Sequence, residues 1–186
     1  SLGFVEIAHP RIDALPSLSS RPSNKILQTF FQKAGDEAIL LLMGLRKTIG
    51  TDPRGLLPPS RKVLLEAAAA PHPKGKNNKL SVSARARAKH AHRGEERFFG
   101  IIKGSPEVQN RETEAIIIKL LNNAAWINLH VFVGTNEQPV LEVRLASGYG
   151  ARWTAEWSDP LNPQSIEFRG FLEPQMPDGH DKGWKH

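Results

Sequence analysis

The sequence predicts an α+β protein, with an N-terminal helical part followed by one helix packed on a mostly antiparallel sheet of four to five strands. Apolar residues recur at spacings of three and four before residue 70 and again after Ser105, as in amphipathic helices. From Trp126 onward apolar and polar residues alternate, as in half-buried strands. With 39% hydrophobic residues in 186, we expect residues 23–186 to form one compact domain.

The first 70 residues divide into two parts. Residues 1–22 contain three prolines and no clear period, so we expect an extended arm. Residues 23–70 form the predicted helical part. Its second helix, capped by Asp36 and ended by Gly50, is apolar on several sides, so we expect it in the core. A third helix begins at Arg61, and Pro71 closes it.

The C-terminal α+β part, residues 104–186, begins with a helix. Ser105 as cap and Pro106 in the first turn predict its start. Strands follow, and the facing pattern of two of them favours a hairpin that pairs Leu145 with Trp153 around a Gly148–Gly150 loop. Gly150 is then expected at positive φ.

Positive charge is concentrated in one predicted connector, residues 71–103. The chain has 25 Lys and Arg against 19 Asp and Glu, a net charge of +6. The connector alone holds nine basic and two acidic residues, a net +7, so the rest of the chain sums to −1. A local basic segment of this kind is typical of contact with nucleic acid or with an acidic protein surface.

Within the connector, residues 83–93 predict a helix capped by Ser81 or Ser83, because alanine favours helix over strand. Its basic residues would form two rows along a phosphate backbone. A solvated helix without a partner is the alternative. We therefore predict a binding module that contacts nucleic acid, RNA in preference, or an acidic partner. The predicted contact residues are Lys79, Arg85, Arg87, Lys89, His90, His92 and Arg93.

An enzyme acting on a phosphorylated or otherwise anionic substrate is the second interpretation. The outward face of the predicted sheet gathers side chains suited to acid–base and phosphate chemistry. Arg144 and Arg152 would hold the anion, and His130 or His180 would transfer protons. The interpretation requires His130, Arg152 and His180 to converge. The full face comprises Asn128, His130, Glu142, Arg144, Arg152, Thr154, Glu156, Glu167 and Arg169.

The sequence excludes or disfavours several classes of protein and several kinds of site. The chain has no cysteine, so disulfide scaffolds, thiolate metal sites and cysteine nucleophiles are excluded. The run Gly148–Trp153 lacks the third glycine of a dinucleotide loop. We expect no cofactor, no metal and no membrane span, and an intracellular location, cytoplasmic or nuclear, or organellar if a targeting segment was removed. A pure scaffold role stays open, and the sequence predicts no oligomeric state.

Four short motifs resemble an uncharacterised eukaryotic protein family. They are Lys89–Arg93, Gly148–Trp153, Gly170–Pro174 and a tail from Asp178 to His186. The resemblance covers about Pro71 to His186 and implies no activity. It implies that the basic segment, the hairpin and the tail belong to one unit.

Overall fold

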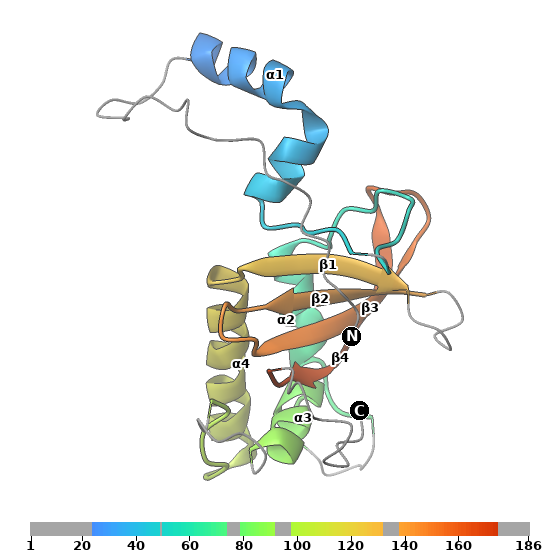
Figure 1. Ribbon diagram of the computed structural model, residues 1–186. Helices are drawn as coiled ribbons and strands as arrows, with labels where there is room; N and C mark the ends of the chain where they lie inside the picture. Colours follow the sequence, from blue (N-terminus) through green and yellow to red (C-terminus); the bar gives the residue numbers. More distant parts are fainter. Residues whose placement is uncertain (1–23, 49, 74–78, 92–97, 132–137, 175–186) are drawn as a thin grey trace, which may run out of the picture.

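A computed structural model describes residues 24–48, 50–73, 79–91, 98–131 and 138–174. These residues form four helices and a four-stranded antiparallel sheet, which confirms the α+β class (Figure 1). The predicted arm, residues 1–22, and the tail from residue 175 lie outside the described residues. No helix in the described ranges has the length and apolar character needed to cross a membrane. The elements are α1 (Asn24–Leu42), α2 (Arg61–Ala69), α3 (Val82–His90), α4 (Pro106–Asn122), β1 (Trp126–Val131), β2 (Pro139–Arg144), β3 (Gly150–Trp157) and β4 (Pro163–Leu172).

The sheet has the strand order β1-β2-β3-β4, and α2, α3 and α4 lie together on one of its faces (Figure 1). The predicted alternation holds: Leu129, Leu141, Val143 and Trp153 are buried in the core between the sheet and the helices. The Nε1 group of Trp153 also donates to the Leu64 carbonyl of α2 at 3.1 Å. The opposite face therefore carries the polar residues of the same strands.

The predicted register of the β2–β3 hairpin is wrong by four residues. Trp153 pairs with Leu141, and Glu142 pairs with Arg152 instead of Glu156. The predicted register would have placed Glu142 opposite Glu156, which are like charges. The observed register instead places the opposite charges of Glu142 and Arg152 across from one another. The three-residue loop is 146–148, and it is Gly148 that has positive φ, at 88°.

The second predicted helix does not lie in the core. It is the last part of α1, which has a non-helical break at Gly35, one residue before the predicted cap. In Figure 1 α1 extends away from the sheet and the other helices. Leu42 and Met43 are exposed, and the chain turns at Gly44, with φ 90°, well before the predicted end at Gly50. Among the described helices and strands, none packs extensively against α1.

The predicted basic connector contains α3, which packs against α4 and β4 as part of the body. Ser81 is the N-cap, and its hydroxyl accepts from the Ala84 backbone N–H at 3.1 Å. Ala84 is fully buried, so one side of α3 faces the rest of the protein. The sequence therefore predicted the helix and its cap, and the structure adds that it is held on the sheet's helical side.

Candidate functional site

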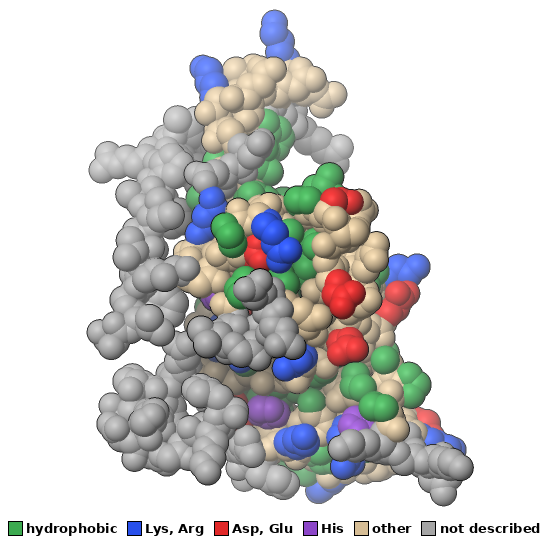
Figure 2. All heavy atoms as spheres, turned by 90° about the vertical axis from the view of Figure 1, so that its right-hand side faces the viewer, with side chains coloured by type: hydrophobic (Ala, Val, Ile, Leu, Met, Phe, Trp, Pro, Cys, Tyr) green, Lys and Arg blue, Asp and Glu red, His purple; other side chains and the backbone are tan. Residues whose placement is uncertain are grey.

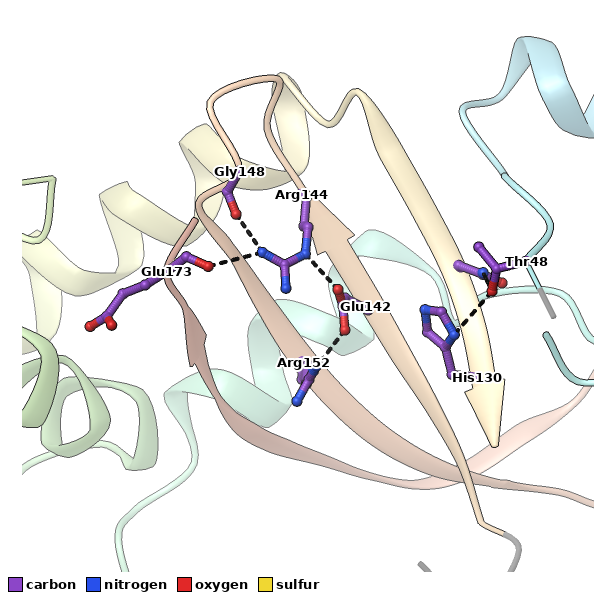
Figure 3. A network of polar contacts seen from close by, with 8 residues as sticks. Thr48, His130, Glu142, Arg144, Gly148, Arg152 and Glu173 are labelled. Carbon is purple, nitrogen blue, oxygen red and sulfur yellow. Dashed lines mark hydrogen bonds and ion pairs between the residues drawn. The ribbon is translucent and has the colours of Figure 1, made fainter. Parts of the chain in front are cut away.

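The outward face of the sheet carries an ion-paired cluster centred on Glu142 (Figure 3). One carboxylate oxygen of Glu142 lies 2.5 Å from Nε of Arg144, and the other lies 2.7 Å from Nε of Arg152. The side chain of Glu142 is 5% exposed and that of Arg152 is 32% exposed. Glu142 and Arg152 are direct cross-strand partners, so the strand register itself brings them together.

The charge state of Glu142 follows from these contacts. Burial raises the pKa of Glu142, but the charges of Arg144 and Arg152 and their hydrogen bonds lower it more, so its pKa lies below the ordinary value. The carboxylate is therefore ionised near neutral pH and is no proton donor there. With two guanidinium groups against one carboxylate, the cluster has a net positive charge.

Arg144 is anchored by the backbone as well as by Glu142. Its Nη1 donates to the Gly148 carbonyl at 2.6 Å and to the Glu173 carbonyl at 3.0 Å (Figure 3). The carboxylate of Glu173 in turn lies 2.9 Å from Nδ1 of His90 in α3. Arg144 is thus held rigidly, whereas Arg152 has more solvent-accessible surface for a ligand.

His130 lies on the same face, on β1. Its Nδ1 is 3.5 Å from the Thr48 hydroxyl, and its ring is 5.2 Å from the ring of Trp126. Burial lowers the pKa of His130; the Glu142 charge opposes this, and the charges of Arg152 and Arg144 add to the lowering. The imidazole is therefore neutral at neutral pH, which is the form that can accept a proton.

This arrangement suits an anionic substrate. A net positive ion-paired cluster can bind a phosphate diester, and a neutral imidazole on the same face of the sheet can remove a proton from a nucleophile. Among the described residues, no three His, Asp or Glu side chains are grouped so as to hold a metal ion.

Comparison with known proteins identifies the family. Residues 69–173 match the model of the CdiA C-terminal tRNase toxin domain, which is more than half of the chain. The chain belongs to this family. The match spans α3, α4 and all four strands, so the ion-paired cluster and His130 lie inside the tRNase toxin domain. The description of the family names action on RNA, in agreement with the RNA partner predicted from the sequence. A search of curated proteins and a search of solved structures gave no significant match.

Of the predicted catalytic residues, two are on one face of the tRNase toxin domain. His130 and Arg152 both point outward from the sheet, and the charge of Arg152 acts on the His130 ring. His180 lies outside the described residues, so its convergence with them stays a prediction. The enzyme interpretation required His130, Arg152 and His180 to converge; the two described residues lie on the same face of the sheet, and their convergence into one site stays a prediction.

The predicted nucleic-acid contacts on the basic segment separate into three groups. Lys79, Arg85 and Lys89 are exposed, whereas His92 and Arg93 lie outside the described residues. Figure 2 shows basic side chains and histidines gathered toward the lower end of the molecule, at the level of α3 in Figure 1. The two predicted basic rows are therefore only partly present.

Arg87 and His90 do not form the predicted second surface row. Arg87 is 3% exposed, and its guanidinium donates to the Phe99 carbonyl at 2.7 Å and to Glu112 at 2.9 Å. His90 is half-buried, and its Nδ1 lies 2.9 Å from the carboxylate of Glu173. Both side chains point into the protein because α3 packs on α4 and β4, and helical spacing alone does not reveal which row is covered.

Two residues near the site were not predicted from the sequence. Thr48, which precedes the matched region 69–173 by 21 residues (69 − 48), contacts His130. Glu173 holds Arg144 through its backbone carbonyl, which any residue type supplies. No sequence pattern marks either residue, because each reaches the site only through contacts between segments that are distant in the chain.

Proposed function

We propose that this chain is a ribonuclease that cleaves tRNA at the outward face of its sheet. The observation that carries the proposal is that His130 lies on the same face of the sheet as the Glu142–Arg152 pair, within the region matched to the tRNase toxin family. A base and a positively charged phosphate site on one surface are the minimum that cleavage of an RNA diester requires.

The proposed reaction uses the ribose 2′-hydroxyl as nucleophile. Neutral His130 takes the 2′-hydroxyl proton, and the 2′-oxygen forms a bond to the adjacent phosphorus. The bond to the 5′-oxygen breaks, giving a 2′,3′-cyclic phosphate and a free 5′-hydroxyl. Arg152 stabilises the charge on the phosphoryl oxygens, and Glu142 and Arg144 hold Arg152 in place. His180 remains the sequence-based prediction for the group that protonates the leaving oxygen.

The test is cleavage of tRNA by purified variants. His130→Gln removes the base and should reduce kcat by roughly 10²- to 10⁴-fold. Arg152→Ala removes one charge-stabilising group and should cost roughly 10²- to 10³-fold. Arg111→Ala, which removes an exposed arginine from the helical side, is the matched control and should cleave like wild type. Full activity of His130→Gln would exclude this site.

We propose further that the exposed part of the basic segment docks the RNA. Lys79, Arg85 and Lys89 together supply three exposed positive charges. Changing all three to alanine should lower the slope of log binding constant against log salt by about 2 to 3, because about three fewer counterions are released. Binding is measured on the catalytically inactive His130→Gln chain, so that the RNA stays intact. An unchanged slope would remove this segment from the interface.

A further inference from the structure

We infer that Trp126 binds an unpaired nucleobase of the RNA substrate by stacking, so that the chain acts on a single-stranded segment. The inference rests on the proposed ribonuclease function, and it adds a position for a base to the groups that take the proton and hold the phosphate. Trp126 differs from the other tryptophans that the structure describes.

The other described tryptophans use their ring nitrogens within the fold. Trp153 is 0% exposed, and its Nε1 donates to a backbone carbonyl of α2 at 3.1 Å. Trp157 is half-buried, and its Nε1 donates to the Leu57 carbonyl at 3.1 Å. Trp126 is also half-buried, but within the described ranges its indole N–H makes no hydrogen bond, and its ring contacts that of His130. A partly exposed indole with an unused donor is suited to a ligand that has both a flat ring and polar groups.

The rings of Trp126 and His130 lean toward each other on the outward face of the sheet. The two residues are four apart on β1, which separates their Cα atoms by about 13 Å. Their ring centroids nevertheless lie 5.2 Å apart, with an angle of 30° between the ring planes. Both side chains therefore bend over Asn128, which lies between them on the same face and is 1% exposed. A flat nucleobase can pack against this aromatic pair.

The aromatic pair lies beside the ion-paired cluster. Trp126 is the cross-strand partner of Arg144, and Asn128 is that of Glu142. Directly paired residues of an antiparallel ladder share a face, with Cβ atoms about 5 Å apart. Arg152 lies opposite Glu142 on the next strand, two strand spacings or about 10 Å from β1. A base at Trp126 and a phosphate at Arg152 can therefore belong to neighbouring nucleotides.

This combination of groups favours an unpaired base as the occupant. The net positive charge of the cluster attracts a phosphate backbone, and the aromatic pair offers a surface for the base that the backbone carries. Inside a duplex the faces of each base are covered by its neighbours, so only an unpaired base can stack on a side chain. Every base has a π-face, so we expect little preference among the four bases. The substrate class is therefore single-stranded RNA.

The binding test uses a short RNA strand with 2′-O-methyl riboses, which the proposed reaction cannot cleave because its nucleophile is blocked. Trp126→Leu keeps an apolar side chain over Asn128 and should weaken binding of the strand roughly 5- to 100-fold. Trp126→Phe keeps a ring for stacking and should bind within about threefold of wild type. Neither variant should change the affinity for a duplex of the same sequence. Phe31→Leu, at an exposed aromatic ring of α1, is the matched control and should bind both RNAs like wild type.

A second measurement uses the wild-type chain. In its NMR spectrum the indole N–H signal of Trp126, assigned by its loss in Trp126→Phe, should shift when the strand is added, because a stacked base adds a ring current. The signal of buried Trp153 should shift much less.

Four results would overturn the inference: no binding of the strand to wild type, unchanged affinity for it in Trp126→Leu, equal weakening for strand and duplex, or an unshifted Trp126 signal at saturation. Full activity of His130→Gln on tRNA would instead overturn the proposed function, so the two failures are distinguishable.

Discussion

At the scale of the residue, His130 determines how the proposed reaction responds to pH. Burial lowers the pKa of His130 below its ordinary value of 6.5. Its neutral form, the base, therefore forms as pH rises through a midpoint below 6.5, and kcat/KM should already be on its plateau at neutral pH. A pH–rate profile with an acidic limb below 6.5 is expected, and a midpoint above that value would contradict the assignment.

The same shift has a consequence for stability. The unfolded chain binds a proton at His130 at higher pH than the folded chain does, so acidification below pH 6.5 should destabilise the fold. Glu142 acts in the same direction at lower pH, because its folded pKa lies below the ordinary 4.5. Urea denaturation of His130→Gln over the pH window below 6.5 should therefore show a weaker acid dependence than wild type.

At the scale of the element, the β2–β3 hairpin aligns the ion-paired cluster. Gly150 lies opposite Arg144 in the ladder, and a Cβ there would be 2.2 Å from the Val143 carbonyl oxygen. The absence of a side chain lets β3 approach β2 closely in the register that pairs Glu142 with Arg152. The hairpin thus contributes directly to the candidate site.

Gly150→Ala should therefore disturb this register. We expect a loss of about 3 kcal/mol or more in the free energy of unfolding, since the neighbour is backbone and cannot move away cheaply. Gly55→Ala is the control: its φ of 70° is left-handed, but no atom lies within 4 Å of the new Cβ. That variant should cost only about 1 kcal/mol. Equal losses in urea denaturation would show that close approach is not the cause.

At the scale of the whole molecule, Arg87 joins parts that are distant in sequence. From α3 it bonds the Phe99 carbonyl and Glu112 of α4, and its Nη2 lies 3.5 Å from the Ile101 carbonyl. A buried guanidinium with these partners holds α3, the 98–101 segment and α4 together. A residue predicted to bind nucleic acid thus has a structural role in the described protein.

Truncating Arg87 should consequently reduce stability more than RNA affinity. Arg87→Ala leaves the buried Phe99 carbonyl without its donor, whereas the Glu112 side chain is 45% exposed and can be solvated, so we expect a cost of about 1–3 kcal/mol. Arg85→Ala, on the exposed side of the same helix, should change stability by less than about 0.5 kcal/mol. Thermal and urea unfolding distinguish them, and equal stability of the two variants would contradict the packing role.

Local sequence patterns were sufficient to predict most of the helices of this protein and the two faces of its sheet. Caps and periodicity predicted α2, α3 and α4, and alternation predicted both faces of the sheet, because these signals depend on neighbours within a few residues. The candidate site residues His130 and Arg152 followed from that alternation. The sequence also showed that positive charge is concentrated in residues 71–103.

Three features depended on contacts between distant segments. The hairpin register was decided by the pairing of Glu142 with Arg152 and by the close approach at Gly150. The direction of Arg87 was decided by the packing of α3 on α4. Thr48 meets His130 only because residues 44–52 pair with the edge of β1. The sequence by itself thus determined the elements and their polar and apolar faces, whereas only the tertiary structure decided which polar side chains meet, because such meetings depend on long-range packing.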